Sequence, residues 1–210
     1  MGFPNGTVLI DSLQGANANP IGAPWAGPTE NGKGQMLIVS AQAAGQAPFS
    51  ACSYIPGITG ATDVEAWMTV VTLPTGGNGV YVDCRIQNPG NAVTEALYRW
   101  VWINGTGFAL SSLLAHGFTQ VGAGFNIHTL AANEQLGVNI TGNVISGYYG
   151  IGSVFTLVNA YTDSTISGIG TIGFGCDDTT TRMINFGGGS ILPLAREQIE
   201  LNAVRTASTW

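Results

Sequence analysis

The sequence predicts an all-β fold, a two-sheet antiparallel β-sandwich of the jelly-roll type. Three observations support this prediction. Helical periodicity is nearly absent, alternating or β-branched runs recur along the chain, and turn residues separate these runs at regular spacing. More than ten short strands with no helices between them are typical of two stacked sheets and not of βαβ units.

The clearest alternation lies in residues 63–73 and 79–87. Side chains of a strand point alternately to opposite faces, so one face of each run is expected to meet the core. In the second run we expect Val80, Val82, Cys84 and Ile86 on one face, and Tyr81, Asp83, Arg85 and Gln87 on the other. Further strands are expected at residues 7–11, 35–41, 95–103, 107–114, 125–131, 135–141, 144–149, 153–161, 171–176 and 182–186.

A chain of 210 residues is expected to form one domain. We assign residues 1–187 to the sandwich and residues 188–210 to a glycine-rich linker and C-terminal arm, because Gly187-Gly188-Gly189-Ser190 breaks the strand pattern. The arm is a candidate assembly contact, ordered by a neighbouring subunit, or alternatively it folds back on its own domain. Its candidate contact residues are Ile191, Leu192, Leu194, Arg196 and Trp210.

Charge and hydropathy narrow the function classes. Only 9% of the residues are charged and the net charge is −6, so a protein that grips nucleic acid through a basic surface is excluded. No apolar run approaches the ~20 residues that span a bilayer, and the start of the chain lacks a signal-peptide pattern. Cys52, Cys84 and Cys176 are expected to be reduced and buried in a protein that folds in a reducing cytosol, with a single disulfide as the alternative.

Several stretches resemble the laminin-G/concanavalin-A-like jelly-roll superfamily, in particular the versions found in bacteriophage virion proteins. They are residues 136–150, 158–175 and the closing strand 182–187, with residues 9–13 and 21–25 similar to the first strand and aromatic loop of that superfamily. The resemblance implies a concanavalin-A-like sandwich. It implies less about function, since one fold hosts many activities.

Catalytic and metal-binding patterns are sparse. A glycanase on this fold needs paired carboxylates, usually as E-x-D-x-x-E, and the nearest approach is Asp63-Val-Glu65, with Met68 where a third acid would stand. Laminin-G-like domains often carry a calcium ion at the rim, for which Asp177 and Asp178 are the candidate ligands, with Asp11 as a neighbour. Solvated turn aspartates are the alternative interpretation.

A glycan site is the more plausible binding site. Sugar sites use an aromatic platform flanked by polar side chains, and Tyr81, Asp83, Arg85 and Arg99 fit this pattern, with Trp67 or Trp102 as the platform. The alternative is that the aromatic side chains lie in the core and the Arg and Asp side chains pair with one another. Asp83 is then expected to pair with Arg85.

These observations together predict a non-enzymatic structural component of a phage virion, either a capsid decoration or a minor tail protein. Its expected partners are other virion proteins and copies of itself, and it would be made in the bacterial host cytoplasm. One alternative is a lectin-like module that contacts host-surface glycans, and another is a glycanase-like enzyme. We expect no cofactor apart from the calcium ion considered above, no nucleic acid and no membrane insertion.

Overall fold

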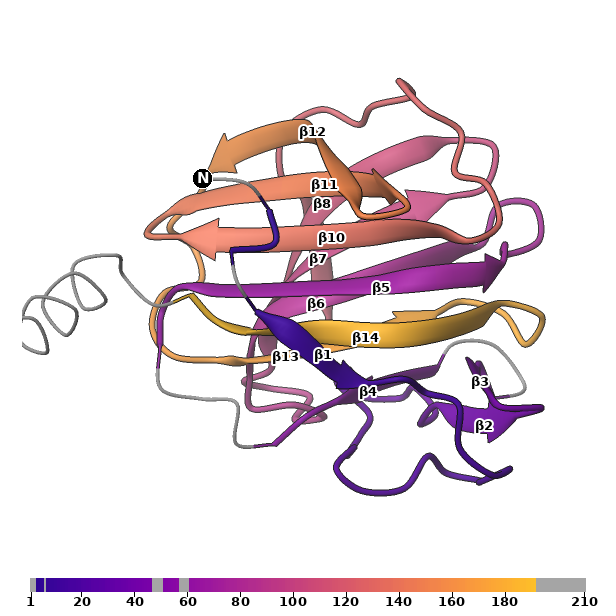
Figure 1. The fold of residues 1–210 in the computed structure, drawn as a ribbon. Helices are drawn as coiled ribbons and strands as arrows, with labels where there is room; N and C mark the ends of the chain where they lie inside the picture. Colours follow the sequence, from indigo (N-terminus) through magenta and orange to yellow (C-terminus); the bar gives the residue numbers. More distant parts are fainter. Residues whose placement is uncertain (1–2, 6, 47–50, 57–60, 192–210) are drawn as a thin grey trace, which may run out of the picture.

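The computed structural model describes residues 3–5, 7–46, 51–56 and 61–191 (Figure 1). These residues form two stacked antiparallel sheets, the larger one in front in Figure 1. The larger sheet contains β1 (Val8–Asp11), β2 (Leu37–Val39), β3 (Gln42–Ala44), β5 (Val64–Thr72), β10 (Glu134–Thr141), β11 (Val144–Ile151), β12 (Val154–Thr162) and β14 (Arg182–Ser190). The smaller sheet contains β4 (Ala51–Tyr54), β6 (Gly79–Gln87), β7 (Ala96–Ile103), β8 (Gly107–Leu114), β9 (Gly117–Gln120) and β13 (Thr171–Cys176).

The strand order defines the centre and the edges of each sheet. The larger sheet runs β12-β11-β10-β5-β14-β3-β2, with β1 paired to β14, and the smaller sheet runs β4-β13-β6-β7-β8-β9. The predicted all-β sandwich is therefore confirmed. In the described residues no helix is long and apolar enough to cross a membrane.

The core lies between the two sheets and is made by alternate residues of the central strands. On β5 the inward set is Val64, Ala66, Met68 and Val70, all fully buried. Trp100 and Trp102 on β7 fill the same layer from the opposite sheet. Because β5 alternates, Glu65, Trp67 and Thr69 point away from the core to the outer face of the larger sheet.

Most expected strands form with small shifts at their ends, but five regions differ. Residues 125–131 form no strand; only Phe125 makes an isolated bridge, to Phe108. Residues 35–41 split, since Ser40 and Ala41 adopt positive φ and turn the chain from β2 into β3. The short strands β4 and β9 were not predicted.

The fifth difference concerns the glycine run, where the sandwich was expected to end. β14 continues through Gly187–Gly189 to Ser190, paired with β5 and β1, so these glycines are part of the sheet and not a linker. Ile191 is buried, and its N–H donates to the carbonyl of Asp63. Leu192, Leu194, Arg196 and Trp210 lie outside the described residues.

The three cysteines are free and buried, as expected. Burial raises the pKa of all three thiols, the first cause in each case being desolvation. They behave as small apolar residues of the interior.

Candidate functional site

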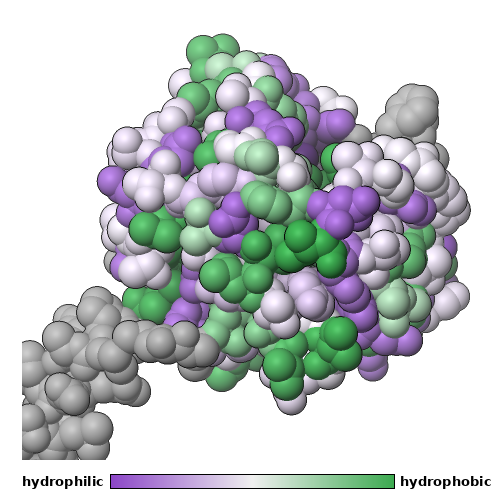
Figure 2. Space-filling model, turned by 90° about the horizontal axis from the view of Figure 1, so that it is seen from above, coloured by the Kyte–Doolittle hydropathy of each residue, from purple (hydrophilic) through white to green (hydrophobic). Residues whose placement is uncertain are grey.

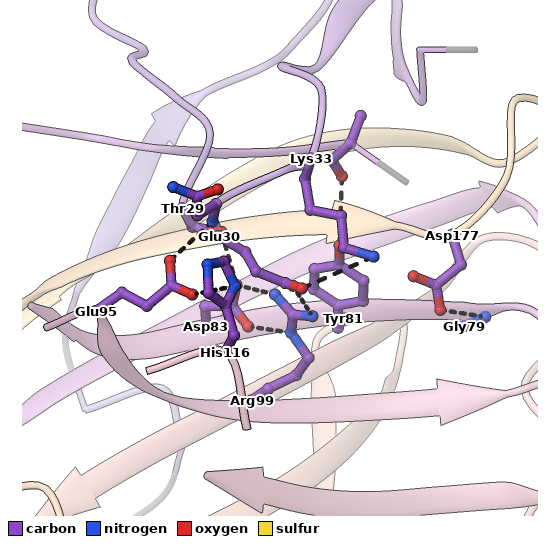
Figure 3. A network of polar contacts seen from close by, with 12 residues as sticks. Thr29, Glu30, Lys33, Gly79, Tyr81, Asp83, Glu95, Arg99, His116 and Asp177 are labelled. Carbon is purple, nitrogen blue, oxygen red and sulfur yellow. Dashed lines mark hydrogen bonds and ion pairs between the residues drawn. The ribbon is translucent and has the colours of Figure 1, made fainter. Parts of the chain in front are cut away.

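The outer face of the smaller sheet carries a buried ion network, hereafter the closed network, made of Glu30, Asp83 and Arg99 (Figure 3). Asp83 and Arg99 are direct cross-strand partners on β6 and β7. Arg99 Nε donates to Asp83 Oδ1 at 2.8 Å, Nη2 donates to Oδ2 at 2.9 Å, and Nη1 donates to Glu30 Oε2 at 3.1 Å. The guanidinium lies 3.5 Å from the centre of the Tyr81 ring.

A loop closes this network from above. Glu30 comes from that loop, and its neighbour Asn31 donates its N–H to the buried carboxylate of Glu95, which also lies 2.9 Å from His116 Nδ1. Asp83 is 0% and Arg99 6% exposed. Burial disfavours the charge of Arg99, but pairing with Asp83 outweighs this and raises the pKa of Arg99. The bidentate pair is thus covered by the protein and has its hydrogen bonds satisfied within the network.

The other residues expected beside this network lie elsewhere. A β-bulge at Arg85, which has a φ of 50°, interrupts the alternation of β6. The Arg85 guanidinium therefore donates to the carbonyls of Thr62, Ile166 and Gly142 and does not pair with Asp83. Trp102 is in the core, on the opposite face from Tyr81.

The candidate calcium ligands are occupied by protein donors. Asp178 accepts hydrogen bonds from backbone and hydroxyl groups of Thr75, Thr180 and Thr181, which lower its pKa despite partial burial. Asp177 accepts from the N–H of Gly79, and Asp11 accepts from Trp25 and Leu13. Within the described residues no three acidic, histidine or cysteine side chains cluster as a metal site.

The outer face of the larger sheet has a different character. It carries an aromatic platform, which we define as Phe3, Trp67, Tyr148 and Phe155, all half-buried. Phe3 stacks on Tyr148 with ring centres 4.2 Å apart and an interplanar angle of 7°, and meets the Phe155 ring edge-on at 4.8 Å. The N-terminal segment that carries Phe3 crosses this face before β1, as Figure 1 shows.

Glycines make room for these rings. Gly187 on β14 and Gly137 on β10 are the cross-strand neighbours of Trp67. A Cβ at Gly187 would overlap the Trp67 indole, and one at Gly137 would overlap the Phe3 ring. The rings therefore lie close to the backbone of the sheet, where other residue types would hold them away.

A polar row runs beside the aromatic platform. It consists of Glu65, Asn139 and Ser146, which are successive cross-strand partners on β5, β10 and β11. The Tyr148 hydroxyl interacts with Ser146 and Asn139, although burial still raises the pKa of Tyr148. Glu65 is fully buried and accepts from the N–H and side-chain amide of Asn5 and from the hydroxyl of Thr7.

This second face was only partly anticipated. Trp67 was considered as a platform residue but with Tyr81, from which the structure separates it by placing the two on different sheets. Phe3, Tyr148, Phe155 and Asn139 were missed. The signal available was the pair of glycines at 137 and 150 within strand-forming runs, which marks positions where a platform ring, Phe3 or Phe155, covers the backbone.

Comparison with known structures defines the class of fold: a jelly-roll sandwich of the concanavalin-A-like type, shared by lectins, carbohydrate-binding modules and glycanases. No protein-family model matches the sequence, and a search of curated protein sequences gives no match. The comparisons give no support to the expectation of a phage virion protein.

Three particular structures illustrate the likeness. The carbohydrate-binding module CBM66 of Bacillus subtilis has a TM-score of 0.55 and 14% identity, covering 70% of this chain and 86% of that one. A prokaryotic β-1,3-1,4-glucanase (lichenase) from a mouse hindgut metagenome has a TM-score of 0.60 and 7% identity, with 87% and 98% covered. The exoplasmic/lumenal domain of VIP36, in its Ca²⁺/Man3GlcNAc-bound form, has a TM-score of 0.57 and 11% identity, with 90% of each chain covered.

Proposed function

We propose that this protein is a non-enzymatic carbohydrate-binding protein whose site is the aromatic platform with its polar row. The observation that carries the proposal is the parallel arrangement of the two on one sheet face. Trp67 and Tyr148 lie on β5 and β11 across Gly137 of β10, and Glu65, Asn139 and Ser146 lie two residues further along the same three strands. Aromatic rings contact the C–H face of a sugar. The polar row is buried, with Glu65 0%, Asn139 8% and Ser146 9% exposed, and it positions the rings: Asn139 and Ser146 interact with the Tyr148 hydroxyl, and Glu65 holds the segment that carries Phe3.

The structural neighbours support the same class of function. CBM66 is a carbohydrate-binding module, the VIP36 domain is named with a bound oligosaccharide, and the lichenase acts on a β-glucan. At sequence identities of 7–14% these similarities indicate a shared fold and do not by themselves establish a function. The proposal for this chain therefore rests on the aromatic platform.

Binding without hydrolysis is favoured by the distribution of acids. Glycoside hydrolysis requires two carboxyl groups roughly 5–10 Å apart across the sugar. The strands of the larger sheet carry only Asp11, Glu65 and Glu134 as acidic residues. All three carboxylates are bonded within the protein: Asp11 to Trp25, Glu134 to His128, and Glu65 to Asn5 and Thr7. Of these three, only Glu65 shares a strand with Trp67.

The same distribution favours an uncharged glycan. Residues 135–162, which include β11, β12 and nearly all of β10, contain no charged side chain. Sulfated or uronic-acid sugars would find no arginine or lysine here and would lie near the carboxylate of Glu65. We therefore expect neutral polysaccharides to bind and acidic ones to be rejected.

The test is calorimetric titration with a panel of neutral and acidic oligosaccharides. Trp67→Ala should raise the Kd for a bound neutral sugar about tenfold or more, which corresponds to about 1.4 kcal/mol of lost ring contact. Phe118→Ala is the matched control, because Phe118 is an exposed aromatic residue on the smaller sheet and its removal should leave the Kd unchanged.

Asn139→Ala gives a second measurement that does not depend on the packing of Trp67, and we expect it to weaken binding as well. Thermal unfolding of each variant separates lost binding from lost folding. The proposal would be overturned if the parent protein bound none of the oligosaccharides, or if Trp67→Ala and Phe118→Ala changed the Kd equally.

A further inference from the structure

The edges of the two sheets are protected unequally. The strands at the ends of the two sheets are β2 with 3 residues, β4 and β9 with 4 residues each, and β12 with 9 residues. β1, which pairs only with β14, adds a short further edge of 4 residues. Bridges cover two of the short edges: Ala18 pairs with Ile38 on β2, and Gly34 pairs with Ala51 on β4. Short or covered edges are the usual protection against pairing with another chain, and β12 lacks both.

β12 also lacks the residues that guard exposed edges. Its sequence, Val-Phe-Thr-Leu-Val-Asn-Ala-Tyr-Thr, contains no charge and no proline. Val154 is 67% and Leu157 50% exposed, and Ile151 at the end of β11 is 56% exposed. Figure 2 looks onto the side of the molecule where β12 lies in Figure 1 and shows hydrophobic side chains gathered on that surface.

The loop around Gly122 and Ala123 contacts β12 through a side chain, since the Tyr161 hydroxyl donates to the Ala123 carbonyl, but no described loop pairs with the backbone of this strand. None of the loop backbone hydrogen bonds of the described residues reaches positions 154–162. The N–H of Ala160 is held at 2.7 Å by the side chain of its own neighbour, Asn159. About 30 Å of strand, at roughly 3.3 Å per residue, is thus available for pairing.

Charge favours a second copy over a charged partner at this edge. The chain carries a net charge of −6, so two copies repel each other over most of their surface. Residues 135–162 are uncharged, and two copies that meet there bring no like charges opposite each other. A charged partner such as nucleic acid or an acidic polysaccharide would gain nothing from this surface.

We propose that β12 pairs antiparallel with β12 of a second copy, which joins the two larger sheets across a two-fold axis. The bulge of β12 defines the register. Leu157 and Ala160 pair with Tyr148 and Ser146 of β11, so both face the platform side, and Val158 is the extra residue between them. An axis between Val158 and Asn159 places Leu157 opposite Ala160 of the second copy, with both side chains on the same face.

This pairing sets the two aromatic platforms side by side. Phe155 lies in the platform and on β12 itself, so in the dimer each platform ends at the shared edge. The dimer does not depend on the proposed glycan, and it can be tested in the absence of any sugar.

Sedimentation equilibrium of the full chain tests the pairing directly. The parent protein should sediment as a dimer, and Leu157→Lys should sediment as a monomer because it sets a cation against the partner edge. Ile169→Lys is the matched control: it adds the same charge at an exposed isoleucine away from β12 and should remain dimeric. A monomeric parent protein, or a dimeric Leu157→Lys variant, would contradict the proposal.

Two further measurements keep the test independent of folding and of the C-terminal arm. A chain that ends at residue 191 should remain dimeric, whereas loss of the dimer would assign assembly to the arm instead. Leu157→Cys mixed with Ala160→Cys should form an intermolecular disulfide on mild oxidation, and Val93→Cys mixed with either should not. The three native cysteines are buried and give little background. Equal cross-linking in all mixtures would exclude the register that places Leu157 opposite Ala160 of the second copy.

Discussion

The two outer faces of the sandwich carry different kinds of side chain on similar antiparallel sheets. On the smaller sheet, charged side chains are covered by a loop and satisfied by one another, as in the closed network. On the larger sheet, uncharged aromatic side chains lie half-exposed over glycines. The difference teaches that the buried charges of the smaller sheet serve internal structure, while the face on which we propose glycan binding carries few charges.

The largest effect is expected when the closed network on the smaller sheet is disrupted. Asp83→Ala leaves the Arg99 guanidinium buried with Glu30 as its remaining carboxylate, and we expect it to lower the free energy of unfolding by about 3–5 kcal/mol. Urea denaturation measures this loss. The double variant Asp83→Leu, Arg99→Met removes both charges and should recover most of the stability. An Asp83→Ala protein of parental stability but altered sugar binding would reverse our assignment of the two faces.

A smaller loss of stability is expected on the outer face of the larger sheet, where Glu65 anchors the N-terminal segment. Glu65→Gln replaces one acceptor oxygen by an N–H₂ group facing the donors of Asn5 and Thr7, so we expect a loss of about 1–3 kcal/mol. Hydrogen exchange at the Asn5 amide should rise at the same time. Unchanged protection of this amide would mean that Phe3 alone holds the segment on the sheet.

The smallest effect concerns the pH dependence of the closed network. Burial raises the pKa of Glu30 above its usual value of 4.5, although Arg99 and Lys33 act in the opposite direction. A carboxyl group with a raised folded-state pKa contributes stability below about pH 4.5, and this contribution is lost as the pH rises through the folded-state pKa. Parent stability should therefore fall relative to Glu30→Gln between pH 4 and 7, on the order of a few tenths of a kcal/mol or more. A difference that is flat or rises with pH would contradict the direction assigned to Glu30.

The fold was predictable because β-strand alternation is local. The run expected at 63–73 forms β5 at Val64–Thr72, and its inward and outward sets follow from the sequence alone. The turn at Gly142-Asn143 likewise joins β10 to β11 as expected. Local patterns of this kind do not depend on distant contacts.

The site was harder to predict because the pairing register of the strands, which the sequence does not show, decides which of its residues lie next to one another. The bulge at Arg85 reverses which of the following side chains face outward, so Arg85 leaves the set that contains Asp83 and Ile86 joins an outer cluster with Leu97. Phe3 reaches the platform from far along the chain. Residues 125–131 have a strand-like composition, but His128 stacks on Tyr149 and bonds to Glu134, which holds this segment as an irregular loop.

Gly137 and Gly187 have a consequence for recognising relatives of this chain. What shapes the aromatic platform is the missing methyl group beneath each ring, so even alanine at either position would push the aromatic side chain outward. Relatives that keep these rings flat on the sheet are therefore expected to keep glycine at both positions, beneath the Trp67 indole at 187 and beneath the Phe3 ring at 137.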